Sequence, residues 1–278
     1  AHGGPPQRYK APHVQDAPGL PIIAIPTTAG TGSEATRFTI VTDEATDEKM
    51  LCAGLAYLPI AALVDYELTL TKPERLTIDT AIDSLTHAIE AYVSRRANPF
   101  ADGMAIAAMR NIAVHLPRVI ADPADRAGRE ALMLGATQAG IAFSNSSVAL
   151  VHGMSRPIGA FFHVPHGLSN AMLLPVVTEF SAGAALHRYA DCARAMGVAD
   201  DREGDQSAVA RLQAALREMN RAFNVPSPRS HGIDEARWFG SIDQMATQAL
   251  ASGSPANNPR EASHAEIVRL YEQVWVEG

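Results

Sequence analysis

The chain has 278 residues, of which 47% are hydrophobic and 19% are charged, a composition typical of a folded soluble protein. A formal net charge of -7, without a cluster of Lys and Arg, excludes an ordinary nucleic-acid-binding protein. Cys52 and Cys192 stand far apart, no apolar run is long enough to span a membrane, and no secretion signal is present, so we expect a cytoplasmic protein with no membrane partner.

Residues 1–72 predict β-rich structure after a lead that is rich in Pro and Gly. The apolar run at 21–25 is typical of a short buried strand. Alternation at 37–42 predicts a second strand that pairs with 49–52 across a polar tip, and 60–64 forms another apolar run.

From Pro73 onward the sequence predicts helices, because apolar residues recur with a period of 3.6 and β-branched clusters are few. Proline is tolerated in the first turn of a helix, which supports helix starts at Pro73 and Pro99. The expected helices are 73–94, 99–120, 126–143, 151–159, 166–180, 183–196, 205–223, 234–251 and 263–275.

Asp83 and His87 form the first candidate metal-binding pair. They lie four residues apart on a predicted helix, so both side chains project from one face and can reach a shared ion. The alternative is a hydrogen-bonded pair on the helix surface.

Three further histidines, His152, His163 and His166, lie among apolar residues and small turn formers. Histidines in apolar surroundings need partners, and a divalent ion supplies one. Asp83, His87, His152 and His166 together form a mixed carboxylate and imidazole set suited to Fe²⁺, Zn²⁺ or Mn²⁺, with His163 as the competitor of His166. Such a site retains net positive charge, which polarises a carbonyl oxygen.

The loop Thr27–Glu34, with the sequence TTAGTGSE, is dense in glycine and hydroxyl groups. Its backbone N–H groups can approach a phosphate or a nicotinamide ring closely. A tight turn without a ligand is the alternative, since the chain contains no GxGxxG or GxxxxGK[ST] motif.

Three motifs together resemble the iron-containing (group III) alcohol dehydrogenase family: PTTAGTGSE at 26–34, D-x-L-T-H-A-I-E-A-Y-V-S at 83–94, and H-G-M-x-x-P-I-G-A-x(5)-H-G at 152–167. The resemblance extends through Asn257-Asn258-Pro259-Arg260. It implies a fold that is mostly α: a remnant of the α/β dinucleotide-binding domain at 1–72, followed by an all-helical metal-binding domain at 73–278.

The resemblance also assigns roles to single residues. Asp83, His87, His152 and His166 match metal ligands, and Phe143 matches a substrate-pocket aromatic, for which ordinary core packing is the alternative. Residues matching the lining of the cofactor site are Thr27, Thr28, Thr31 and Lys49.

The sequence departs from the family at two points. The family's Gly-Gly-Gly-Ser pyrophosphate loop precedes TTAGTGSE, and this sequence starts after it, so we expect a partial family member whose first seventy residues lack neighbouring strands. Many members carry a histidine four residues after the third ligand, where Arg156 stands here. Arginine stays protonated and cannot act as an ordinary proton relay. Three alternatives remain: His163 replaces that histidine as the catalytic proton relay, Arg156 binds an anionic substrate, or Arg156 is a surface salt-bridge residue.

The function that follows is an oxidoreductase that moves hydride between a metal-bound alcohol or aldehyde and NAD or NADP. One alternative is a metal-dependent lyase or hydrolase on the same scaffold, such as a relative of dehydroquinate synthase. Another is a truncated chain without turnover. The expected assembly is a homo-oligomer.

Overall fold

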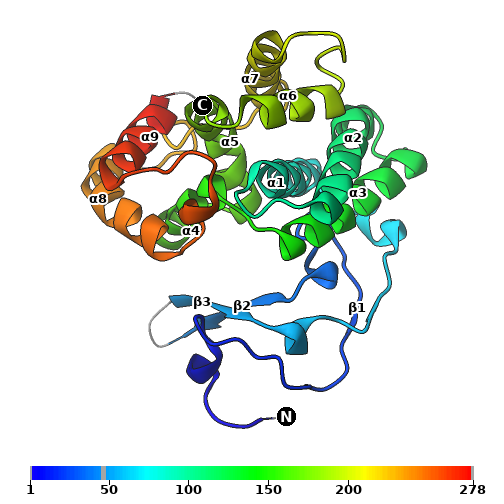
Figure 1. The fold of residues 1–278 in the computed structure, drawn as a ribbon, viewed down its shortest axis with the longest axis vertical. Helices are drawn as coiled ribbons and strands as arrows, with labels where there is room; N and C mark the ends of the chain where they lie inside the picture. The colour runs from blue at the N-terminus through cyan, green and yellow to red at the C-terminus, as the bar shows by residue number, and fades with distance from the viewer. Residues whose placement is uncertain (1, 45–47, 277–278) are drawn as a thin grey trace.

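The computed structural model describes residues 2–44 and 48–276 of the chain. In this part nine α-helices follow an amino-terminal segment with little strand structure (Figure 1). The helices are α1 Glu74–Val93, α2 Pro99–Ala121, α3 Arg126–Asn145, α4 Leu150–Phe162, α5 His166–Ala182, α6 Leu186–Ala195, α7 Asp205–Ala222, α8 Glu235–Ala251 and α9 His264–Val276. The predicted helical region is therefore confirmed. No helix within these residues has both the length and the apolarity to cross a bilayer.

Local signals explain several helix boundaries. The side chains of Asn98, Asp125 and Asp234 accept backbone N–H groups at the starts of α2, α3 and α8, as N-cap residues do. Helix α4 is longer than the predicted 151–159 and ends where His163 takes a left-handed conformation. The mostly helical fold class expected from the sequence is confirmed.

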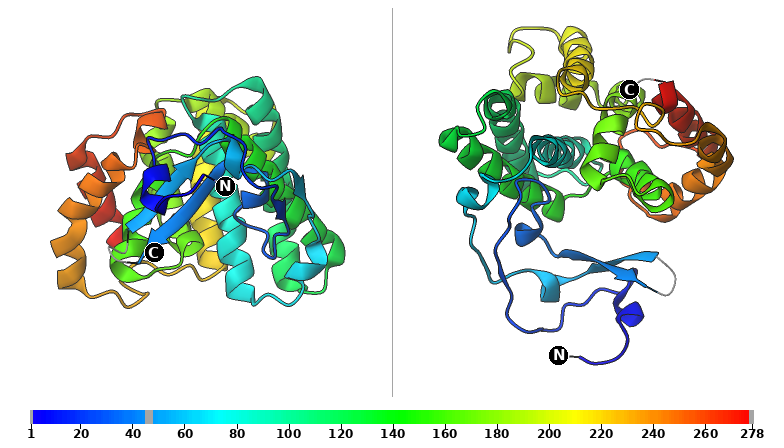
Figure 2. Two further views of the ribbon diagram at one scale, coloured as in Figure 1. Left: turned by 90° about the horizontal axis from the view of Figure 1, so that it is seen from below. Right: turned by 180° about the vertical axis from the view of Figure 1, so that it is seen from behind.

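Helix α1 lies at the centre of the helical part and contacts α2, α3 and α5 (Figures 1 and 2). Its apolar residues Ile82, Leu85 and Ala88 are fully buried. Because neighbours surround it, α1 also buries polar side chains, among them Asp83 and Glu90. Buried polar groups require partners, so the packing of α1 determines where a polar site can form.

The amino-terminal segment forms two small sheets. Strands β2 Phe38–Asp43 and β3 Glu48–Ala53 pair antiparallel, which confirms the predicted hairpin. Strands β1 Ile23–Ala24 and β4 Ala61–Ala62 pair in parallel and with no other strand in the described residues.

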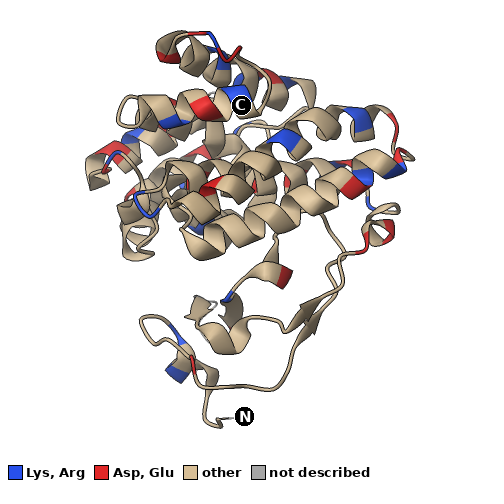
Figure 3. Cartoon of the chain, turned by 45° about the vertical axis from the view of Figure 1, so that its right-hand side comes forward, with Lys and Arg blue, Asp and Glu red and all other residues tan. Residues whose placement is uncertain are grey.

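The prediction of a buried strand at 21–25 is wrong. Only Ile23 and Ala24 form the strand, and Ile23 is 62% exposed. The apolar run at 60–64 likewise yields a two-residue strand, with Ile60 72% exposed. A strand is buried only when neighbours cover its faces, and this segment extends away from the helices (Figures 2 and 3).

The loop at 27–36 fastens this segment to the helices. The Ser84 hydroxyl on α1 donates to the carbonyl of Gly30 at 2.8 Å, and Thr137 on α3 donates to the buried Glu34 carboxylate at 2.6 Å. Gly32 adopts a left-handed φ of 59° and its backbone meets that of Gly140 on α3. The loop therefore lies against α1 at Ser84, the residue after Asp83.

Replacing Gly140 with Ala tests this close approach. A Cβ at position 140 would overlap the carbonyl of Gly32, so we expect a loss of stability on the order of 1–3 kcal/mol, as for other overpacked sites. Thermal unfolding measures it. The control is Gly103→Ala on α2, where a Cβ meets nothing within 4 Å and helix propensity predicts a gain of up to about 1 kcal/mol. Equal melting temperatures for both variants would contradict the proposed contact.

Candidate metal centre

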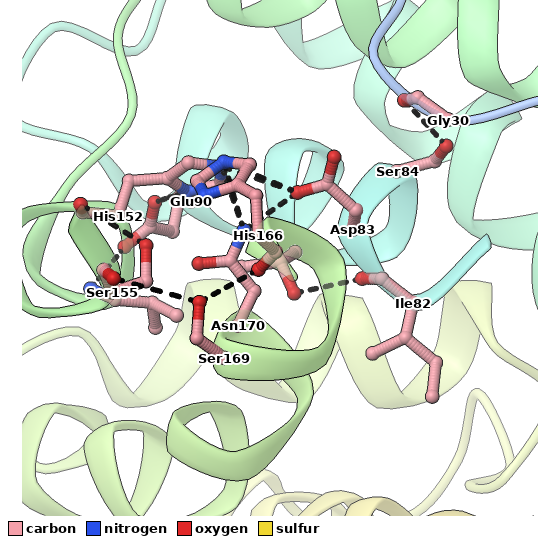
Figure 4. A network of polar contacts seen from close by, with 12 residues as sticks. Gly30, Ile82, Asp83, Ser84, Glu90, His152, Ser155, His166, Ser169 and Asn170 are labelled. Carbon is pink, nitrogen blue, oxygen red and sulfur yellow. Dashed lines mark hydrogen bonds and ion pairs between the residues drawn. The ribbon is translucent and has the colours of Figure 1, made fainter. Parts of the chain in front are cut away.

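Three side chains from three helices point toward one another (Figure 4). Asp83 comes from α1, His152 from α4 and His166 from the first turn of α5. One ligand atom of each lies within 4.8 Å of those of the other two. The Asp83 and His152 side chains are almost fully buried, whereas His166 is 44% exposed, so the cluster opens toward solvent on the His166 side.

An amide nitrogen lies at the centre of these three groups. Nδ2 of Asn170 donates to Oδ1 of Asp83 at 2.6 Å and lies 3.2 Å from Nε2 of His152 and 3.3 Å from Nε2 of His166. The Asn170 side-chain oxygen is buried without a hydrogen-bond partner. Atoms of the three side chains therefore surround one point, which the Asn170 amide nitrogen occupies.

Glu90 orients His152 from behind. Its carboxylate accepts the backbone N–H groups of Ala149 and Val151 at 2.9 and 2.6 Å, and Nδ1 of His152 at 2.6 Å. Helix α4 has no side-chain cap of its own, so Glu90 on α1 caps it from another helix. Because Nδ1 is bound to Glu90, Nε2 of His152 faces the cluster, as in carboxylate–histidine–metal arrangements.

Burial and charge shift the pKa values in opposite directions. Burial raises the pKa of Asp83, but His87, His166 and His152 outweigh it and hold the pKa well below its usual range. Burial lowers the pKa of His87 to about 3 against the opposing charge of Asp83. Burial also acts against protonation of His152, yet Glu90 and Asp83 raise its pKa to about 9. The site therefore holds an ionised carboxylate and a neutral His87 at neutral pH.

His87 lies beside the three converging groups. Its ring stacks on that of His152 with centroids 4.3 Å apart and on that of Phe143 at 4.4 Å. Its Nδ1 atom is buried and has no hydrogen-bond partner. Phe143 in turn stacks on Phe38 of β2, so this candidate pocket residue connects the histidines to the amino-terminal segment.

These residues fit a divalent transition metal. One carboxylate and two imidazoles meet at a single point, and a third, neutral imidazole adjoins them with an unsatisfied nitrogen. Imidazole with carboxylate suits Fe²⁺, Zn²⁺ and Mn²⁺. A divalent ion would take the place of the Asn170 amide hydrogens at the centre of the cluster.

The other candidate residues lie outside this group. His163 is exposed at the end of α4. Thr27 and Thr31 are exposed and Thr28 is half-buried, all in the loop that Ser84 anchors. Lys49 belongs to β3, and its side chain lies outside the described residues.

Arg156 is half-buried one turn after His152, and its Nη1 donates to the Ser254 hydroxyl at 3.1 Å. The interpretation of Arg156 as a surface salt-bridge residue is not supported, because the side chain is half-buried and no carboxylate in the described part of the chain pairs with it.

Sequence reasoning missed Glu90 and Asn170. Glu90 follows His87 by three residues, which places both near one face of α1. Asn170 follows His166 by four residues on α5. Both spacings were visible in the sequence, but an isolated Glu or Asn at helical spacing is not specific enough to indicate a metal site.

A helical bundle with a carboxylate and histidine centre at its core defines a class of metal-binding proteins. Comparison with protein families identifies the family. The model of the carboxyl-terminal part of the Fe-containing alcohol dehydrogenase family matches residues 77–275, and the model of iron-containing alcohol dehydrogenase matches residues 4–66. The chain belongs to the iron-containing alcohol dehydrogenase family.

Individual relatives agree with this assignment. The chain is 40% identical over 256 residues to the probable alcohol dehydrogenase EutG of Escherichia coli, covering 91% of this chain and 62% of EutG. It is 36% identical to the NAD-dependent methanol dehydrogenase of Bacillus methanolicus, covering 97% and 70%. The solved structure of a 1,3-propanediol oxidoreductase superimposes with a TM-score of 0.93 at 33% identity, covering 99% of this chain and 71% of that chain. The chain thus spans less than three quarters of the length of these proteins.

Glu90→Gln tests the orientation of His152. Loss of the carboxylate removes the acceptor that fixes Nε2 toward the cluster, so Zn²⁺ affinity should fall about 10- to 100-fold, as for other residues that orient ligands. Competition with a chromophoric chelator measures the affinity. The matched control, Glu130→Gln, changes an exposed glutamate on α3 and should leave the affinity unchanged. Equal affinities for both variants would contradict the role of Glu90.

Proposed function

We propose that this chain is the metal-binding part of an NAD(P)-dependent alcohol dehydrogenase or aldehyde reductase. The observation that carries the proposal is the convergence of Asp83, His152 and His166 from three helices. The names of the relatives describe redox enzymes, which favours hydride transfer over the lyase or hydrolase alternative.

The ion would be held by Asp83, His152 and His166, with His87 as the fourth ligand after its ring turns toward the cluster. Iron is the expected metal, with Zn²⁺ or Mn²⁺ as alternatives. When bound, such an ion polarises the oxygen of an aldehyde or alcohol. Glu90 keeps His152 in the orientation that binding needs.

The cofactor would approach from the side of the loop Thr27–Glu34. Support comes from the hydrogen bond between Ser84 and Gly30, because it holds this loop one residue from Asp83 along α1. Thr27, Thr28, Thr31 and Lys49 are the proposed cofactor contacts, for NAD or NADP. On this view residues 1–72 are part of the dinucleotide-binding domain and 73–278 form the catalytic domain.

The substrate would lie against Phe143, whose ring stacks on His87. We assign proton exchange with solvent to His163, since it is exposed and lies three residues from the exposed ligand His166. A homo-oligomer is supported by exposed apolar side chains in and beside β1 and β4, namely Ile23, Ile60 and Leu63. The two buried, unpaired cysteines favour a reducing cytoplasm.

Asp83→Ala tests the proposed function. Without the carboxylate the ion loses its one anionic ligand, so the bound metal should fall from one ion per chain to near zero after gel filtration. Oxidation of NADH or NADPH with short aldehydes should fall with it. Elemental analysis measures the bound metal, and absorbance at the nicotinamide band measures the oxidation of NADH or NADPH. Both are measured for this chain and for the longest product of its gene.

The matched control is Asp201→Ala, which removes an exposed carboxylate outside the cluster. It should retain the metal and the rate of the unaltered chain. If Asp83→Ala bound metal as well as this control, the proposed site would be wrong. If the longest gene product bound metal but oxidised neither nucleotide, the alternative without turnover would replace the dehydrogenase.

A further inference from the structure

In the described part of the chain, no carboxylate forms an ion pair with the guanidinium of Arg156, which feels Glu90 only from a distance. Its hydrogen-bond partner within residues 2–44 and 48–276 is the neutral hydroxyl of Ser254. A guanidinium offers five N–H donors. Burial lowers the pKa of Arg156 against the opposing charge of Glu90, but an arginine remains protonated at neutral pH. Most of its donors are therefore available to a ligand.

Arg156 also lies close to the metal centre. It follows His152 by one turn of α4, and residues at this spacing have Cβ atoms about 5–6 Å apart. Its positive charge is among the causes that lower the pKa of His87. No hydrogen bond or ion pair joins Glu90 to Arg156, and the Glu90 carboxylate instead accepts two backbone N–H groups and His152.

Ser254, the hydrogen-bond partner of Arg156, belongs to a segment that contacts the connection between α3 and α4. Ser254 is buried and precedes the 3-10 helix η5, Pro255–Asn257. The side chain of Asn257 donates to the Ser147 hydroxyl at 2.8 Å, in the connection that follows Phe143 and precedes α4. The Arg156 side chain thus connects α4 to Ser254. The segment after Ser254 contacts the chain just after Phe143, where we propose that the substrate lies.

The cofactor loop lies on the other side of the cluster. In Figure 4, Gly30 and Ser155, the residue before Arg156, appear at opposite sides of the labelled group, with Asp83 and His166 between them. Because Arg156 follows Ser155 on α4, a nicotinamide that enters along the loop would approach the cluster from the side away from this part of α4. This separation argues against the cofactor phosphates as the partner of Arg156.

We propose that Arg156 binds an oxyanion at the far end of a short aldehyde or alcohol substrate, an inference that rests on the proposed dehydrogenase function. A guanidinium fork matches a carboxylate or phosphate in a bidentate arrangement. The substrate class is then an aldehyde that carries a carboxylate or phosphate a few bonds from its carbonyl carbon. Its reacting end lies at the metal and its anionic end at Arg156.

Matched four-carbon ligands test the assignment. Calorimetric titration of the full chain with 4-hydroxybutanoate and with butan-1-ol needs no turnover, and we expect the anion to bind the unaltered chain more tightly. Arg156→Gln should weaken binding of the anion about tenfold or more, as expected for lost charge-assisted hydrogen bonds, and leave butan-1-ol unchanged. Arg156→Lys should recover part of the affinity. The control Arg110→Gln alters an exposed arginine of α2 and should change neither.

Kinetics add a second readout. With 4-oxobutanoate, Arg156→Gln should raise KM about tenfold or more and leave the KM of butanal unchanged. Glycolaldehyde phosphate in the same assay distinguishes a phosphate from a carboxylate as the preferred oxyanion. Equal losses for charged and neutral ligands, or no preference for any anion in the unaltered chain, would overturn the assignment. Selective anion binding without hydride transfer would instead refute the proposed function and leave the role of Arg156 intact.

Discussion

The contact between the Glu90 carboxylate and the start of α4 is the interaction on which the site depends. It satisfies two backbone N–H groups that α4 cannot satisfy from its own sequence, and it accepts Nδ1 of His152. A carboxylate at a helix amino terminus also opposes the positive end of the helix dipole. One buried side chain on α1 thus fixes where α4 begins and which nitrogen of His152 faces Asp83.

The burial of α1 makes this arrangement necessary. A helix enclosed by α2, α3 and α5 cannot leave a carboxylate such as Asp83 or Glu90 without partners, because an unpaired buried charge is strongly destabilising. Glu90 finds its partners in α4, and Asp83 finds them in His152 and Asn170. The same polar contacts that stabilise the packing also hold the candidate metal ligands close together.

The sequence predicted local features better than distant ones. Helical periodicity located the helices, and the four-residue spacing of Asp83 and His87 correctly placed them one turn apart on one helix. The strand expected at 21–25 failed because burial depends on neighbours that a local pattern does not reveal. The cap by Glu90 joins residues about sixty positions apart, and the amide of Asn170 carries no chemical signature in a sequence. Their roles follow only from the packing of α1, α4 and α5.

The position of a bound metal tests this account most directly. Crystals of the chain grown with Zn²⁺ and measured at the zinc absorption edge should show one anomalous peak at about 2.0–2.2 Å from Asp83, from Nε2 of His152 and from His166. The Asn170 amide nitrogen should have moved away from the centre of the cluster. A peak elsewhere, or an Asn170 amide that remains hydrogen-bonded to Asp83 at saturating Zn²⁺, would contradict the assignment of this cluster as the metal centre.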